Sequence, residues 1–145
     1  MKLSTKGRYG LRAMLELALR DSREPTMGRD IASAQAIPED YLEQVLITLR
    51  KADLVRSIRG ANGGYFLARP AEQITTLEIV EAMEGTLLPL ECLYKPEVCE
   101  RSSYCAASEL WGEAAEAFRD VLRQTTLALL RDRQRAKLVT ADFHI

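Results

Sequence analysis

Hydrophobic residues near the start of the chain recur at intervals of three and four: Leu11, Met14, Leu15, Ala18 and Leu19. Charged residues stand outside this stripe, among them Arg8, Arg12 and Glu16. One apolar face and one charged face are typical of an amphipathic helix that packs on a core. The pattern therefore predicts a helix over residues 5–20.

Two further helices are predicted after a break at residues 21–26. The first is short, over residues 27–35, and its small side chains allow close packing. The second runs from about Pro38 to Ala52, because proline suits the first helical position and basic residues suit the last turn. Its apolar side would be buried, which leaves Glu43 and Gln44 toward solvent or a partner. Two short helices joined by a brief turn are compatible with a helix-turn-helix.

A β-hairpin is predicted directly after these helices, with strands at residues 55–58 and 65–68. Gly60, Gly63 and Gly64 suit a tight tip between them. Arg56, Arg59 and Arg69 place positive charge around the hairpin. A helix-turn-helix followed by a basic hairpin has the element order of a winged helix, whose hairpin reaches the minor groove.

The second half of the chain predicts a helix after Thr75 or Thr76 that stops at Gly85, then a loop to about residue 106. One long helix is expected from Ser108 to about Lys137. It would span about 45 Å, more than a domain of this size needs for its own core, so we interpret it as a dimerisation helix. A packing helix that folds back on the domain is the alternative.

The expected fold class is thus mainly α with a small β-hairpin: a winged helix-turn-helix plus a long C-terminal dimerisation helix. The expected segments are a DNA-binding domain at 1–70, a connecting helix and cysteine-bearing loop at 71–106, the dimerisation helix at 107–137 and a tail at 138–145.

Composition and charge agree with one domain or a domain plus an arm. The 145 residues are 47% hydrophobic, and the formal net charge is −1. Basic residues exceed acidic ones by four in residues 1–70, whereas acidic residues exceed basic ones by five in the remainder. This asymmetry favours a polyanion-binding half joined to a half with another task. The first apolar stretch is broken by charges, so neither a signal peptide nor a membrane span is predicted and a cytoplasmic location is expected.

The candidate DNA-binding residues lie in the predicted winged helix. On a recognition helix, Glu43 can accept from cytosine N4 and Gln44 can pair with an adenine edge. Lys6, Tyr41 and Arg50 suit phosphates, and Arg59 at the hairpin tip suits a narrow minor groove. The alternative is that Glu43 and Gln44 simply solvate a helix.

All three cysteines lie in one short segment: Cys92, Cys99 and Cys105. In a reducing compartment, such a cluster favours metal ligands or reactive thiols over disulfides. The segment has no close C-x2-C pair, which disfavours structural zinc without excluding it; the other readings are an iron-sulfur cluster and a metal-free thiol group. The single histidine, His144, stands next to the end of the chain, so no Cys-His catalytic pair is expected and the protein is not predicted to be an enzyme.

The chain resembles the Rrf2 family of bacterial transcription regulators, and within it the members that regulate iron-sulfur cluster assembly. The segments that carry the resemblance are residues 1–18, residues 37–69, and the cysteine triplet followed by Glu109, Leu110 and Trp111. It implies a homodimeric regulator, a repressor or an activator, whose three cysteines hold a cluster, with 2Fe-2S favoured over 4Fe-4S.

The resemblance also implies roles for single residues. Glu43 matches a position that selects between classes of DNA site, and Arg59 and Gly60 match residues that enter the minor groove. Tyr9, Tyr41 and Gln44 match further DNA contacts. Ser108 stands where related members have a histidine, so the fourth cluster ligand is open. The runner-up is a metal-free thiol-sensing or small-effector regulator of the same fold; a redox or electron-transfer protein and a metal-free scaffold rank lower.

Overall fold

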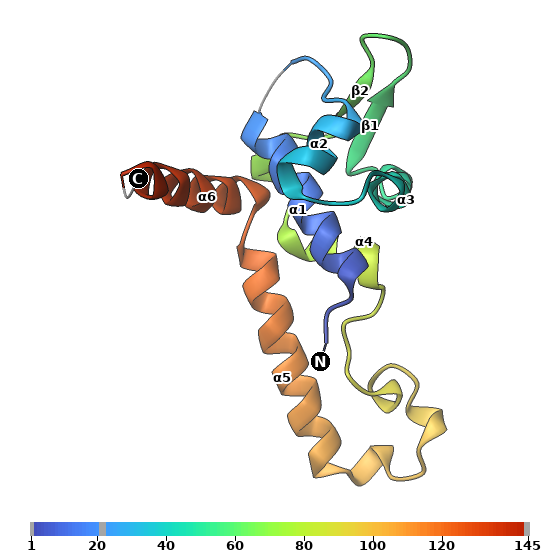
Figure 1. The fold of residues 1–145 in the computed structure, drawn as a ribbon. Helices are drawn as coiled ribbons and strands as arrows, with labels where there is room; N and C mark the ends of the chain where they lie inside the picture. Colours follow the sequence, from blue (N-terminus) through green and yellow to red (C-terminus); the bar gives the residue numbers. More distant parts are fainter. Residues whose placement is uncertain (1, 21–22, 144–145) are drawn as a thin grey trace.

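The computed structural model describes residues 2–20 and 23–143. Within these residues the chain forms helices and one antiparallel hairpin, in the order α1 (Thr5–Arg20), α2 (Gly28–Gln35), α3 (Glu39–Lys51), β1 (Val55–Ile58), β2 (Gly64–Leu67), α4 (Thr76–Glu84), α5 (Ala106–Gln124) and α6 (Leu127–Asp142). Single turns of 3-10 helix occur at residues 71–73, 91–93, 96–98 and 102–104. The predicted fold class, a mainly helical winged helix-turn-helix with a small hairpin, is confirmed (Figure 1).

The main core forms around α1, which packs against α2, α3, α4 and α6. The predicted apolar stripe of α3 is fully buried in this core: Leu42, Val45, Leu46 and Leu49. Met14 from α1, Ile31 from α2 and Ile79 from α4 meet it there, each with no exposed surface. Burial of these side chains provides most of the driving force that orients α3 on the body.

The hairpin is anchored to the body through its second strand. Val55 pairs with Leu67 and Ile58 pairs with Gly64, so the two strands are in register over their whole length. Thr26, in the loop before α2, forms a further bridge with Tyr65 through two backbone hydrogen bonds of 2.8 Å. The tip of the hairpin projects beyond α2 and α3 (Figure 1).

Helix α4 begins and ends as its sequence predicts. The Thr75 hydroxyl accepts a hydrogen bond from the Glu78 N–H, and the Glu78 carboxylate accepts from the Thr75 N–H, which together form a capping box. Gly85 follows the last turn with a φ of 79°, a conformation that favours glycine.

The expectation of one unbroken helix from Ser108 to about Lys137 is wrong. The helix stops at Gln124, and Thr125 and Thr126 run in an extended conformation before α6 begins. These two residues pair with the start of α4: the Thr76 N–H donates to the Thr125 carbonyl and the Leu127 N–H donates to the Ile74 carbonyl. Thr126 then caps α6 through its hydroxyl. Helical structure also continues to Asp142, through much of the expected tail, while His144 lies outside the described residues.

The break leaves α5 extending from the body in one direction and α6 projecting from it in another (Figure 1). Leu127, the first residue of α6, is buried in the main core. Phe118 and Leu122 of α5 pack against a small second cluster formed by Leu77 and Val80 of α4 and by Leu87 after it. An ion pair of 2.7 Å between Arg119 and Glu81 reinforces this contact and raises the pKa of the Arg119 guanidinium. None of the described helices is both long and apolar enough to span a membrane.

Candidate nucleic-acid interface

The outer side of α3 carries the predicted base-reading residues. Because Leu42, Val45 and Leu46 are buried, the side chains between them, Glu43 and Gln44, face away from the core and are exposed. Tyr41, at the start of the same helix, is also exposed. The structure therefore presents polar groups that can donate to and accept from base edges along one face of a rigidly held helix.

The N-terminal end of α3 is acidic. Glu39, Asp40 and Glu43 line a shallow hollow of about 230 Å³ together with Arg29 of α2. The three carboxylates disfavour a phosphate inside this hollow, whereas a carboxylate suits the exposed amino group of cytosine. The positive charge expected of a DNA-binding surface lies instead at the other end of α3 and in the hairpin.

The hairpin tip exposes Arg59 and Gly60, as predicted. Gly60 has a φ of 112°, which favours glycine at this position. A β-carbon on Gly63 would overlap the carbonyl oxygen of Ile58, so the chain can close the tip only with glycine there. The turn thus holds Arg59 outward at the end of a narrow projection, a shape that fits a groove of DNA.

Arg50 connects the two candidate DNA-reading elements. It lies in the last turn of α3, and its guanidinium donates a hydrogen bond of 3.2 Å to the hydroxyl of Ser57 in β1. Arg50 and Arg59 lie on the lining of one open groove of about 320 Å³ between the helix and the hairpin. The expectation that both residues serve the same polyanion therefore has a geometric basis.

The residues expected from α1 also lie near α3. The rings of Tyr9 and Tyr41 are 5.3 Å apart and nearly perpendicular, a favourable edge-to-face contact. Lys6 is half-buried one turn before Tyr9. Arg12, which the sequence did not single out, lies with its guanidinium 5.5 Å from the Tyr9 ring centre. The sequence signal for this contact is that Arg12 stands three residues after Tyr9 on a helix, a spacing that brings the two side chains together.

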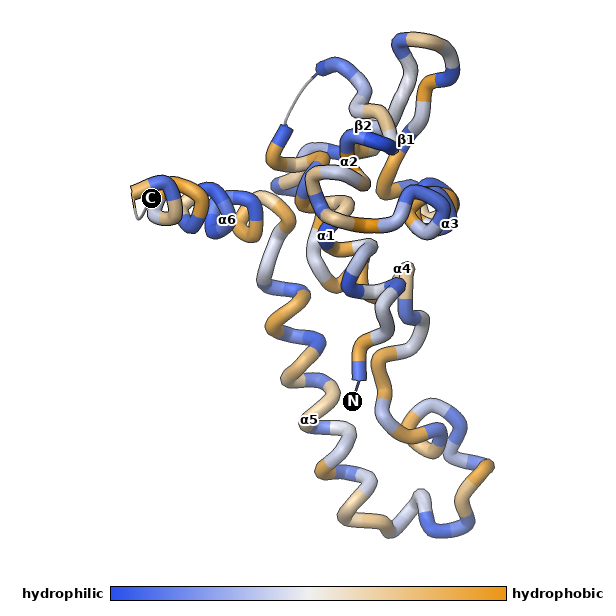
Figure 2. The backbone as a smooth tube through the Cα atoms, viewed as in Figure 1, coloured by the Kyte–Doolittle hydropathy of each residue, from blue (hydrophilic) through white to orange (hydrophobic). Residues whose placement is uncertain are grey.

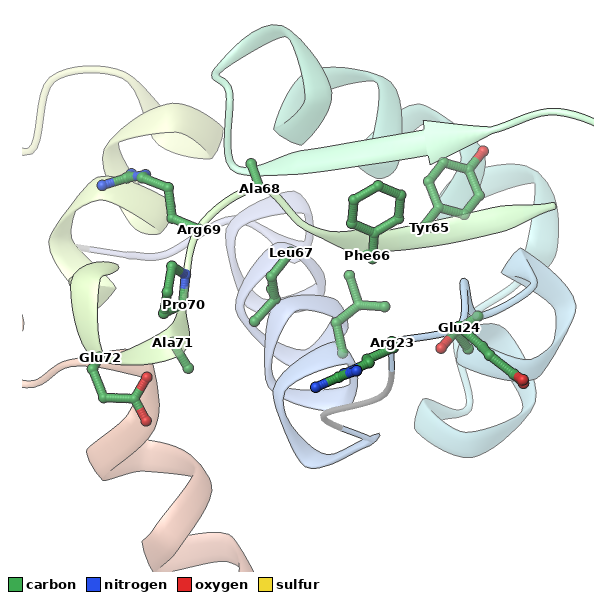
Figure 3. A pocket seen from close by; sticks show the side chains of 12 residues that line it. Arg23, Glu24, Tyr65, Phe66, Leu67, Ala68, Arg69, Pro70, Ala71 and Glu72 are labelled. Carbon is green, nitrogen blue, oxygen red and sulfur yellow. The ribbon is translucent and has the colours of Figure 1, made fainter.

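A separate hollow of about 320 Å³ lies at the base of the hairpin, between α1 and the chain after β2 (Figure 3). Arg69, expected to place charge at the hairpin, lines it, but its guanidinium points away and donates to Glu78 at 2.8 Å (Figure 3). Glu72 on the same rim pairs with Arg131 of α6 at 3.3 Å. Because these groups stabilise contacts between elements, we assign Arg69 a structural role and place the candidate site on α3 and the hairpin tip.

The three cysteines lie on the loop between α4 and α5, all half-buried and none in a disulfide. Cys92 lies in a single 3-10 turn, Cys99 follows the next, and Cys105 stands immediately before α5. The Cys92 sulfur is 4.0 Å from the hydroxyl oxygen of Ser108 in the first turn of α5. Across residues 2–20 and 23–143, no group of three or more Cys, His, Asp or Glu side chains is arranged to hold a metal ion.

The donor set nevertheless fits an iron-sulfur cluster in its chemistry. Three thiols are the ligands such clusters use, and a hydroxyl oxygen stands next to one of them. The sulfurs are joined by short turns whose backbone hydrogen bonds reach only three or four residues along the chain. Such a loop can rearrange to bring its thiolates together without disturbing the main core.

The chain is similar in sequence to one family of known proteins. The sequence model of the Rrf2 family, described as an iron-dependent transcriptional regulator, matches residues 3–133. Protein rrf2 of Nitratidesulfovibrio vulgaris is 43% identical over 133 residues, which cover 91% of this chain and 89% of the relative.

Two solved structures are similar over nearly the whole chain. CymR of B. subtilis, described as its global cysteine regulator, is 43% identical with a TM-score of 0.78, and the match covers 92% of this chain and 98% of CymR. IscR of T. potens is 36% identical with a TM-score of 0.75, over 94% of this chain and 90% of IscR.

Proposed function

Because the chain belongs to the Rrf2 family of transcription regulators, we propose that it binds a specific double-stranded DNA operator as a homodimer and that its cysteine loop controls this binding. In this proposal α3 enters the major groove and the hairpin enters the adjacent minor groove. Glu43 and Gln44 read base edges, Lys6, Tyr9, Tyr41 and Arg50 contact phosphates, and Arg59 with Gly60 occupies the minor groove.

One observation carries the DNA-binding part: Arg50 and Arg59 line one groove between α3 and the hairpin, and Arg50 holds the hairpin through Ser57. A helix and a hairpin that are fixed to each other can follow two neighbouring grooves of one duplex. Two arginines on that groove provide the positive charge that the acidic start of α3 does not.

The outer face of α5 supports the homodimer. Leu110, Ala114, Ala117 and Val121 repeat at four, three and four residues, and all four are exposed. They lie apart from the inner stripe of Phe118 and Leu122 that contacts α4. The alternation along the helix is visible in Figure 2. An apolar stripe with alanines in its middle allows a second copy of the same helix to approach closely.

We further propose that Cys92, Cys99 and Cys105 hold an iron-sulfur cluster, with 2Fe-2S favoured over 4Fe-4S. When bound, such a cluster would supply sensitivity to iron supply or oxidation. The loop leads directly into α5, and α5 is tied to α4 through Arg119 and Glu81. A loop conformation that depends on the cluster would therefore shift DNA affinity through these helices, by a coupling of typically about 1–3 kcal/mol.

The hairpin is tested with an Arg59→Ala variant in a fluorescence anisotropy titration on an operator selected from random DNA. We expect weaker binding, because the positive charge that suits the electronegative minor groove is lost. Arg133→Ala, on the exposed side of α6, is the matched control and should bind like the unaltered protein. Equal affinity of both variants would contradict the proposed docking.

The cluster is tested by visible spectroscopy on protein purified without oxygen. We expect absorption bands that disappear when Cys92, Cys99 or Cys105 is replaced by alanine, and iron and sulfide in the protein by elemental analysis. Colourless protein that contains zinc would indicate a structural metal site instead.

A cluster-free regulator that responds to its thiols is the second candidate. The described loop does not gather the three sulfurs, and the similar protein CymR is described as a global cysteine regulator. This candidate predicts colourless, metal-free protein whose operator affinity changes on mild oxidation and recovers on reduction. Replacing the cysteines by serine would abolish that response.

A further inference from the structure

One face of α1 carries a line of polar residues that the proposed DNA contacts do not use. Arg12, Glu16 and Arg20 follow Tyr9 at spacings of three and four, so all four lie on the same side of the helix. This side faces the turn between α2 and α3, since α1 packs against both helices (Figure 1).

Glu16 supplies the carboxylate of this line, and it is buried, with 9% of its surface exposed. One of its oxygens accepts a hydrogen bond of 3.0 Å from Arg20, and the other accepts a bond of 2.9 Å from the side-chain amide of Gln35. A carboxylate held at this depth is stable only while both partners remain in place. Glu16 therefore fixes the position of the Gln35 side chain.

Gln35 is the last residue of α2, and the chain reverses at the next residue, Ala36, whose φ of 51° is left-handed. Arg12 binds Gln35 twice. Its Nε donates to the side-chain oxygen at 3.3 Å, and its Nη2 donates to the main-chain carbonyl oxygen. The side-chain oxygen, the side-chain amide and the main-chain carbonyl of Gln35 are thus all directed at α1.

Arg12 also contacts the far side of the turn through aromatic rings. Its guanidinium lies over Tyr9, and the Tyr9 ring meets that of Tyr41 in the first turn of α3. The line on α1 therefore contacts the end of α2 through hydrogen bonds to Gln35 and the start of α3 through the ring of Tyr41. The turn of the helix-turn-helix lies between these two contacts.

We infer that Arg12, Glu16 and Gln35 form a polar clamp that sets the angle between α2 and α3, and that they are positioning residues for operator recognition. The inference rests on the proposed function, because it assigns no DNA contact of its own. Apolar side chains let two helices slide by small amounts, whereas a fully bonded set of directional polar groups specifies one arrangement. A change in this angle would move Glu43, Gln44 and Tyr41 together relative to the bases.

Direct contact with DNA does not explain this arrangement. Gln35 directs its amide and carbonyl at Glu16 and Arg12, and the Glu16 carboxylate would repel a phosphate. The clamp is linked to the reading helix α3 through the ring contacts of Arg12 with Tyr9 and of Tyr9 with Tyr41.

The test exchanges the acid and the amide. In Gln35→Glu two carboxylates face each other, so we expect the selected operator to bind about ten- to a hundredfold more weakly, as for an unpaired buried polar group. In the double variant Glu16→Gln, Gln35→Glu, the amide at position 16 can donate to the carboxylate at position 35. The amide oxygen at position 16 still accepts from Arg20, and the carboxylate at position 35 still accepts from Arg12. This exchanged protein should bind the operator within about twofold of the unaltered protein, since the ion pair lost at Arg20 is replaced by one at Arg12 and every polar group keeps a partner.

Gln73→Glu is the matched control, because it adds the same charge in the 3-10 turn after the hairpin, away from the clamp. Circular dichroism and thermal unfolding establish that each variant is folded. If Gln35→Glu does not fold, the double variant is the test. A folded double variant that binds the operator tightly supports the clamp, and a folded double variant that binds it weakly overturns the clamp. Equal affinity of Gln35→Glu and Gln73→Glu also overturns it.

These outcomes differ from failure of the proposed function. If DNA binding through the hairpin is wrong, Arg59→Ala binds the operator as well as the unaltered protein does. If only the clamp is wrong, Arg59→Ala still weakens binding while Gln35→Glu does not.

Discussion

The winged-helix body and the cysteine loop, residues 86–105, are held together in different ways. In the body, whole side chains such as Leu46 and Ile79 are buried, and polar bonds join residues far apart in sequence, as between Arg12 and Gln35. In the loop only Leu87 is buried, and every backbone hydrogen bond within residues 90–105 closes a turn of three or four residues. One region is specified by long-range packing and the other by local turns.

This difference suggests a division of labour. A surface that discriminates between base sequences must hold its reading groups in one geometry, which a dense core and a polar clamp provide. A segment that gains or loses a cluster, or changes thiol state, must move at low cost, which few buried contacts allow. The two regions meet at α4 and α5, where Arg119 binds Glu81.

The largest expected difference between the regions is in stability. Leu46→Ala should lower the free energy of unfolding by about 2–5 kcal/mol, because it leaves a cavity in the core. Val98→Ala, at a loop position where the side chain is about half exposed, should change the free energy of unfolding by less than about 0.5 kcal/mol. Urea unfolding followed by circular dichroism measures both. Similar losses would mean that the loop is part of the cooperative core.

The second difference concerns what each region controls. Glu43→Ala should reduce discrimination at one base pair by about 1–3 kcal/mol, since a single base-edge contact is lost. Cys99→Ala should change affinity while the preferred sequence stays the same. Selection from a random DNA pool with each variant separates the two effects. A new preferred sequence for Cys99→Ala would show that the loop shapes the reading surface itself.

The third prediction concerns the break between α5 and α6, where the chain returns from the loop and α5 to the body. Thr126→Ala removes the hydroxyl that caps α6 and should lower the free energy of unfolding by about 1 kcal/mol. Thr126→Ser keeps the cap and serves as the control. If the two variants unfold at the same urea concentration, the hydroxyl does not stabilise the break between α5 and α6.

The smallest expected effect is the pH dependence at Glu78. Burial opposes ionisation of this carboxyl, but hydrogen bonds from the Thr75 N–H and the Arg69 guanidinium prevail and lower its pKa. The stabilisation is therefore present above the ordinary pKa of glutamate and is lost as the pH falls through the lowered value. Glu78→Gln should have a lower free energy of unfolding than the unaltered protein at neutral pH, and this difference should become smaller as the pH falls. A gap that widens in acid would contradict the assignment.

The elements that sequence patterns predicted correctly are those set by local chemistry. The apolar stripe of α3 predicts one buried face, and the glycines from Gly60 to Gly64 predict a tight hairpin tip. The capping box of Thr75 and Glu78 is likewise a short-range signal. The exposed positions of Glu43, Gln44 and Arg59 follow from these patterns, so much of the candidate site could be predicted.

The remaining features depend on contacts between distant residues. Nothing near Thr125 and Thr126 resembles a helix stop, since neither proline nor glycine is present; the break exists because these residues pair with the start of α4. The contact of Arg12 with Gln35 depends in the same way on how α1 packs against α2. The arrangement of the three cysteines depends on loop turns that no periodic pattern specifies.

The most direct test of the account is amide hydrogen exchange of the protein alone and with its selected operator, using a scrambled duplex of equal length as the control. We predict that the operator slows exchange in α3 and at the hairpin tip, residues 39–51 and 56–65, more than the scrambled duplex does. Protection confined to α5 and α6, with α3 and the hairpin unchanged, would contradict the claim that these two elements read DNA.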